Sequence, residues 1–200
     1  VSGAATLAGA LDLRLVAADV DAGKLGTALG VTGLTGRGDL SAQVTGTASQ
    51  PRAAGRLALA RGRAQQLSFA GLQADFDVQS LQRGNVRFSV TDARASGVPL
   101  AVRAASGRAD LDGKAIRLSG VRVDLGKGVV TAEGKATRDG ALDLGVKASG
   151  VDLAMLARAA GMAGQEAGGV ADFDGRVGGS IKAPRLSGDA TVANGAFRGL

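Results

Sequence analysis

Cysteine, histidine, tryptophan and tyrosine are all absent from this 200-residue chain, and its only aromatic residues are five phenylalanines. Without histidine and cysteine, the chain lacks the commonest general base, thiol nucleophiles and the usual side-chain ligands of transition metals. Ser–His and Cys–His catalysis are therefore excluded, and the composition predicts no enzyme, no cofactor and no metal site. With so few aromatic rings, recognition by stacking is also disfavoured.

The sequence has no apolar run near the roughly 18 residues of a membrane-spanning helix and no signal peptide at its start. We expect any membrane anchor to lie outside this segment. The net charge is +6, but basic residues are scattered among aspartates, and the densest cluster is only Arg61 and Arg63. This pattern favours a solvated outer face over a nucleic-acid interface; attraction to anionic lipid headgroups is the weaker alternative.

Alternation with a period of two dominates the sequence. Because successive side chains of a strand point to opposite faces, this pattern predicts a sheet with one aliphatic and one polar face. Turn signals such as 112–114, 126–128 and 139–140 recur every 9 to 14 residues, so we expect antiparallel hairpins in an all-β meander of roughly 14 to 16 strands. Helical spacing is confined to two short segments, at about 21–29 and 152–160, where Asp21 and Asp152 stand at the N-cap positions.

The chain contains an internal repeat. Residues 9–21 return as 140–152, an offset of 131, and the pattern around Pro51 returns around Pro184 at an offset of 133. Residues 1–67 therefore match 132–200, and residues 68–131 form the remainder of the first unit. We expect one continuous repetitive β segment, about one and a half repeats of a longer protein.

The aliphatic face of such a sheet must be covered, and two short helices cannot cover it all. The sheet could fold on itself into a closed sandwich, or curl into a trough whose apolar inside holds another molecule. Aspartate pairs such as Asp75 and Asp77 lie on the polar face and are interpreted as solvated surface. The Gly-rich stretch 30–38 lacks the spacing of a phosphate-binding loop.

The order of the repeated unit resembles a known family. A short helix is followed by a Gly-x-Gly strand and then by the spacing Gly46, Pro51, Gly55 and Gly62, which returns as Gly179, Pro184, Gly188 and Gly195. This order is similar to the repeating unit of the TamB family of translocation and assembly module proteins, within the AsmA-like superfamily of bridge-like lipid-transfer proteins.

The resemblance implies an open, apolar-lined trough, often called a β-taco, in a protein of the periplasm that is anchored in the inner membrane. It implies that phospholipid moves through the trough between the inner and outer membranes, and that the protein supports outer-membrane biogenesis and protein assembly. The implied partners are phospholipid acyl chains and an outer-membrane barrel of the TamA/Omp85 type. The family has no catalytic residues to carry over.

Alternating positions on the aliphatic face are the predicted lining of this lipid groove. They are Phe76, Val78, Val86, Phe88, Val90, Leu100, Val102, Val121, Val123, Leu125, Leu142, Leu144, Val146, Phe173 and Val177.

Two other readings remain at this point. A structural, extracellular β-repeat or adhesin module would use the same face as a closed, dry core. A fragment of an outer-membrane barrel would need aromatic girdles, which a chain without tryptophan and tyrosine does not have.

Overall fold

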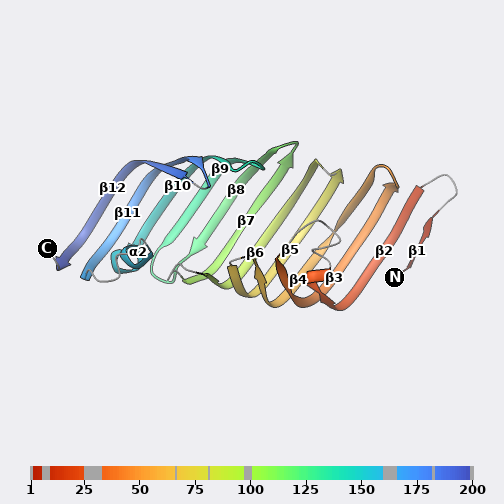
Figure 1. Ribbon diagram of the computed structural model, residues 1–200, viewed down its shortest axis with the longest axis horizontal. Helices are drawn as coiled ribbons and strands as arrows, with labels where there is room; N and C mark the ends of the chain where they lie inside the picture. The colour runs from red at the N-terminus through yellow and green to blue at the C-terminus, as the bar shows by residue number, and fades with distance from the viewer. Residues whose placement is uncertain are drawn as a thin grey trace.

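The computed structural model describes residues 2–5, 10–24, 33–65, 67–80, 82–96, 101–159, 166–181 and 183–198. These residues form one sheet and two short helical segments (Figure 1). The elements in chain order are β1 (Ser2–Ala5), β2 (Ala10–Asp21), β3 (Leu34–Thr47), β4 (Pro51–Ala64), β5 (Leu67–Ser80), β6 (Arg83–Ala95), β7 (Ala101–Asp112), β8 (Ala115–Asp124), β9 (Val129–Thr137), β10 (Ala141–Asp152), α2 (Leu153–Ala159), β11 (Glu166–Ser180) and β12 (Ala183–Arg198).

The strands follow one another in the sheet in their sequence order, β1 to β12, and every pair of neighbours is antiparallel. The predicted all-β antiparallel meander is confirmed, and the sheet is not closed into a barrel. The predicted number of 14 to 16 strands is wrong, because the described residues form twelve. Several strands continue through glycines that look like breaks in the sequence, for example Gly36 and Gly38 within β3.

The register places aliphatic residues and glycines in continuous rows across one face of the sheet, which we call the inner face. Residues that pair across neighbouring strands lie on the same face, so each row can be followed from strand to strand. One row runs Leu15, Ala42, Gly55, Phe76, Val86, Ala109, Leu118, Gly134, Leu144, Val177 and Leu186. Another row, closer to the helices, includes Leu59, Leu72, Val90, Ala105, Val123, Val130, Ala148 and Phe173.

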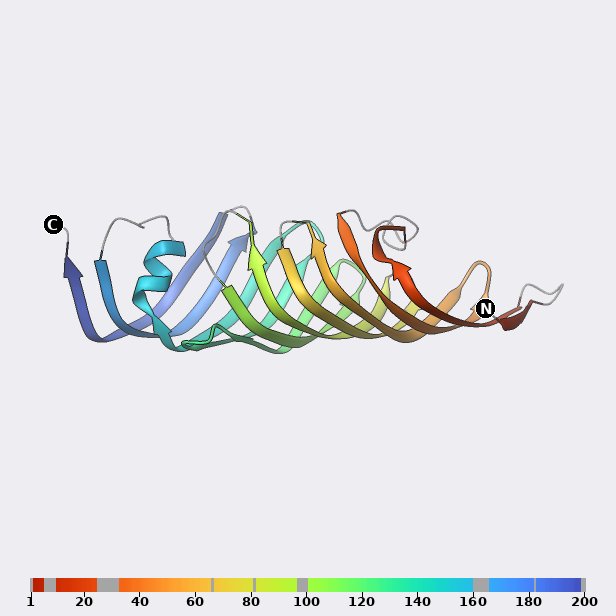
Figure 2. The same ribbon diagram turned by 90° about the horizontal axis from the view of Figure 1, so that it is seen from below.

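The sheet is strongly curved, and α2 lies on its concave side (Figure 2). Each even-numbered strand has one residue in the left-handed region, with φ between 47° and 67°. These residues are Asp19, Arg61, Asp92, Gly120, Gly150 and Asn194. In β2, β4, β8, β10 and β12 the register also shifts by one residue beside this position, which defines a β-bulge. Because bulges bend a strand and increase its twist, a bulge in alternate strands supplies the curvature of the trough.

Aspartates begin both helical segments, as predicted. Asp152 Oδ1 accepts hydrogen bonds from the backbone amides of Ala154, at 2.9 Å, and Met155, at 3.3 Å, at the start of α2. Asp21 Oδ1 accepts equivalent bonds from Gly23 and Lys24. Residues 22–24 are helical, and the rest of the predicted helix at 21–29 lies outside the described residues.

The best-buried side chains lie on the inner face near the helical segments. Ala22 is fully buried against Leu59, Phe69 and Val90, and Ala93 belongs to the same cluster. Val151, which follows the bulge of β10 and precedes α2, is 1% exposed. The helical segments therefore cover the inner face at two places along one rim of the trough. The compact core of the described structure sits under the first of them.

Candidate functional site

The inner face is the candidate functional site, and it contains the predicted groove residues. Phe76, Val78, Val86, Phe88, Val90, Val102, Val121, Val123, Leu142, Leu144, Val146, Phe173 and Val177 all lie in its cross-strand rows. Leu125 follows β8, in the turn closed by the hydrogen bond from its amide to the Gly128 carbonyl. Leu100 lies outside the described residues.

No charged side chain interrupts these rows between β2 and β12 in the described strands. Most of the large side chains in them are half-buried, as expected for a concave wall that is open on one side. Exposure rises at the last strand, where Leu186 is 68% and Val192 is 52% exposed. The face is therefore a continuous hydrocarbon surface that runs across the strands.

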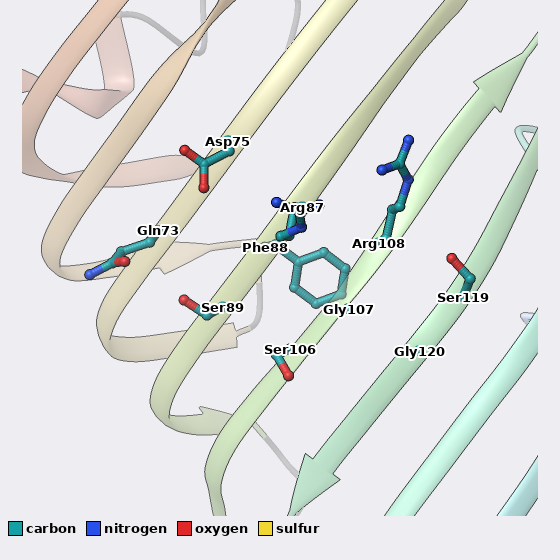
Figure 3. A pocket seen from close by; sticks show the side chains of 10 residues that line it. All are labelled: Gln73, Asp75, Arg87, Phe88, Ser89, Ser106, Gly107, Arg108, Ser119 and Gly120. Atoms are coloured by element: carbon teal, nitrogen blue, oxygen red, sulfur yellow. The ribbon is translucent and has the colours of Figure 1, made fainter.

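Glycines next to phenylalanines keep this surface smooth. Phe88 pairs across the strands with Gly107, and its ring lies over that glycine (Figure 3). A Cβ at Gly107 would stand only 3.1 Å from Phe88 Cζ. The same arrangement joins Phe69 to Gly62, where the corresponding distance is 2.5 Å. Large rings can lie flat along the wall because the facing residue has no side chain. Sequence reasoning missed these pairs, since only the register reveals them.

The outer face of the sheet carries the charges, and many of them are paired across strands. Arg56 Nε donates to Asp75 Oδ1 at 2.7 Å, and Lys147 Nζ donates to Asp174 Oδ2 at 2.9 Å. The latter bond is the main cause that raises the pKa of Lys147. Within β7, Arg108 donates two bonds to Asp110, at 2.9 and 3.2 Å. Several of these outer aspartates, such as Asp75, Asp110 and Asp174, thus serve as partners of basic residues, and the described residues contain no cluster of potential metal ligands.

Two of the outer aspartates have a structural role that sequence reasoning missed. Asp172 Oδ1 accepts a hydrogen bond of 2.8 Å from the amide of Gly150, the bulge residue of β10. Asp39 Oδ1 accepts the equivalent bond, at 3.3 Å, from the amide of Asp19, the bulge residue of β2. Each carboxylate satisfies a backbone donor that the bulge removes from the ladder.

The outer face also has shallow depressions between strands. One of about 480 Å³ lies over β5 to β8 and is lined by Arg87, Arg108 and several serines (Figure 3). Serine hydroxyls here have no histidine to activate them, because the chain has none. We find no arrangement for nucleophilic catalysis in this depression.

Comparisons with family models, with curated proteins and with solved structures find no match to this chain. In the part of the chain that the structure describes, none of the helices has the length and hydropathy needed to cross a membrane.

Proposed function

We propose that this chain is a segment of a lipid-transfer conduit, in which the inner face carries the acyl chains of phospholipids. The observation that supports this proposal is the set of uninterrupted aliphatic rows on a single, open, concave sheet. Together with the order of the repeated unit, it favours a protein of the TamB type in the AsmA-like superfamily. On this proposal, the complete protein is anchored in the inner membrane and spans the periplasm. It carries phospholipid towards the outer membrane, and it supports outer-membrane assembly beside a barrel of the TamA/Omp85 type.

The energetics fit a conduit. Each methylene group of a lipid tail exposed to water costs about 0.8 kcal/mol, so an acyl chain outside a bilayer costs on the order of 10 kcal/mol. A lining that continues across ten or so strands removes much of this cost along the whole path. Within the described strands, the inner face offers no charged or aromatic-cage site that would trap a tail at one point, so the surface favours sliding over tight capture.

The adhesin alternative requires a second layer that seals the inner face. Among the described residues, only residues 22–24 and α2 lie over this face, and both lie along one rim. Outside the buried cluster under Ala22, β4 to β9 present half-buried aliphatic side chains on the inner face without a covering layer among the described residues. In this region, an experiment can best distinguish a lipid groove from the closed core of an adhesin module.

Photo-crosslinking in cells tests the proposal. A photoreactive amino acid at the inner-face positions Val86, Phe88, Val123 and Leu144 should capture phospholipid, whereas the outer-face positions Asp77 and Arg87 serve as matched controls on the same sheet. Labelled lipid is measured by mass spectrometry of the purified chain. Equal labelling of the two sets, or labelling of neither, would contradict the conduit.

A further inference from the structure

The positive charge of the chain is concentrated in its middle. Residues 51–124, which include β4 to β8, have twelve Lys or Arg against six Asp, so this segment accounts for the whole net charge of +6. The rest of the chain has twelve residues of each sign. Eleven of the twelve basic residues in the middle segment are arginines. A planar guanidinium binds phosphate through two parallel hydrogen bonds, which an ammonium group cannot do.

Four of these arginines gather at the rim of the trough beside the buried cluster under Ala22. We call them the rim arginines: Arg61 and Arg63 on β4, Arg94 on β6 and Arg103 on β7. All four are exposed, and none of them forms an ion pair with another described residue. The one acid among them is Asp92, on β6.

The register brings two rim arginines to one place. Ser68 on β5 pairs with Arg63 on one side and with Arg94 on the other. Neighbouring strands are about 4.8 Å apart, so the backbones of the two arginines are about 10 Å apart. Their long side chains can therefore reach a single phosphate group between them. In contrast, Arg56, Arg83 and Arg108 of the same segment already have aspartate partners.

The hydrophobic wall lies directly behind this row. Gly62 and Phe69, which pair beside Arg63 and Ser68, belong to the inner face, and Phe69 is 4% exposed in the cluster with Leu59 and Val90. Because Ala22 already covers this cluster, a ligand that places a phosphate at the arginines would lay its hydrocarbon part on the half-buried inner face beside the cluster, at Phe88 and Ala105. A nucleic acid would be expected to use stacking rings, and the chain has no tryptophan or tyrosine.

We propose that the rim arginines bind the phosphate headgroups of anionic phospholipids. This inference rests on the proposed function and names the class of lipid that the groove takes. The site would hold the headgroup outside the trough while the tails lie on the inner face.

Vesicle co-sedimentation of the whole chain tests the inference. The vesicles contain phosphatidylcholine alone or with phosphatidylglycerol, at constant ionic strength. The variant Arg63→Gln/Arg94→Gln should bind the anionic vesicles about 25-fold more weakly, since each basic residue near an anionic surface contributes about fivefold. The matched control Arg87→Gln/Arg117→Gln removes the same charge from the middle of the outer face and should lose much less. An equal loss in both variants would show attraction by net charge alone and would overturn the rim site.

Two further experiments are needed. One distinguishes a lipid headgroup from other sources of phosphate, and the other distinguishes the headgroup site from the proposed conduit. In the first, millimolar inorganic phosphate or a single-stranded oligonucleotide competes with the anionic vesicles for the chain. If either competes as strongly as unlabelled anionic vesicles do, recognition of a lipid headgroup is overturned. Transfer of diacylglycerol, which has tails but no phosphate, reports on the groove alone. The rate of diacylglycerol transfer should be unchanged in Arg63→Gln/Arg94→Gln. A lower rate in this variant would place the arginines in the groove and overturn the separate headgroup site. Failure of the wild-type chain to transfer diacylglycerol would count against the conduit, whatever the vesicle result.

Discussion

Introducing a charge on the inner face distinguishes a lipid groove from a protein core, and Leu144→Arg is the sharpest such change. Leu144 lies in the middle of β10, pairs with Gly134 and Val177, and is half-buried. Full burial of a leucine side chain stabilises a protein by roughly 1.5–3 kcal/mol, so a half-buried one contributes about 1 kcal/mol. The arginine stem can still cover the sheet while its guanidinium reaches water at the open side. We therefore expect the free energy of unfolding to fall by about 1 kcal/mol.

The effect on lipid binding should be much larger. A tail that crosses position 144 would contact a charged group instead of a methyl group, and a charge within hydrocarbon costs roughly 3 kcal/mol. This corresponds to a loss of affinity of about 150-fold. In a closed core, by contrast, the same substitution would bury an unpaired charge and cost the protein more than about 4 kcal/mol of stability.

Ala141→Arg is the matched control, because Ala141 is exposed on the outer face of the same strand. It should change the unfolding free energy by no more than about 0.5 kcal/mol and leave lipid affinity unchanged. Since the chain has no tryptophan or tyrosine, urea unfolding is followed by far-ultraviolet circular dichroism, and affinity by titration with a fluorescent acyl probe. The reasoning is refuted if Leu144→Arg unfolds the chain, or if both variants bind the probe equally well.

Three further predictions concern stability. Leu59→Ala, in the buried cluster, should lower the free energy of unfolding in urea by about 2–5 kcal/mol. Leu186→Ala, at a side chain that is 68% exposed, should lower it by less than about 0.5 kcal/mol. Similar losses in both variants would mean that the edge strand is covered in solution. Gly62→Ala should destabilise the sheet by about 1–3 kcal/mol, because its Cβ would stand 2.4 Å from the Thr35 carbonyl oxygen, while Gly145→Ala, with its nearest atom at 3.8 Å, is the tolerated control. The hydrogen bond from Lys127 is the main cause that lowers the pKa of Asp152. The ionised carboxylate therefore stabilises the fold at a pH above the ordinary pKa of aspartate. This contribution is lost as the pH falls through the lowered pKa. The unfolding free energies of wild type and Asp152→Asn, from urea titrations, should therefore differ by under about 1 kcal/mol at pH 6 and converge as the pH falls from about 4 towards 2. A constant difference from pH 6 to pH 2 would contradict this assignment.

The alternation of residue types was enough to predict the two faces, because in an antiparallel meander each strand contributes its odd or even positions to a common surface. Phe76 and Val86, for example, are predicted on the same face and pair directly in the structure. The helix caps at Asp21 and Asp152 could also be predicted from the sequence, because a capping hydrogen bond joins residues that are close in the chain. What depends on two adjacent strands, such as the ring of Phe88 over Gly107, requires the register and could not be read from the sequence.

The resemblance implied a curled trough, but the positions at which the strands bend were not predicted, although the sequence contains a weak signal for them. At a bulge, consecutive inner-face residues are three positions apart instead of two, as for Ala17 and Val20 in β2 or Ala148 and Val151 in β10. The residue with positive φ is glycine in only two of the six strands, and Asp19, Arg61, Asp92 and Asn194 occupy it in the others. Composition therefore gives no general marker for these positions, and the strands look shorter in the sequence than they are.

The two copies of the repeat differ in how closely each face of the sheet corresponds between them. On the inner face, Leu13 of β2 corresponds to Leu144 of β10, and Leu40 of β3 corresponds to Phe173 of β11, so the side chains stay apolar. On the outer face the correspondence is mixed: Asp39 corresponds to Asp172, but Val16 corresponds to Lys147 and Gln43 to Arg176. The backbone conformation is the same in both copies where the strand bends, with φ of 53° at Asp19 and 67° at Gly150. If the outer charges were the primary function, they should correspond more closely than the lining does. Instead, the copies share a bend and an apolar wall, which is what a ligand that slides along the trough would require.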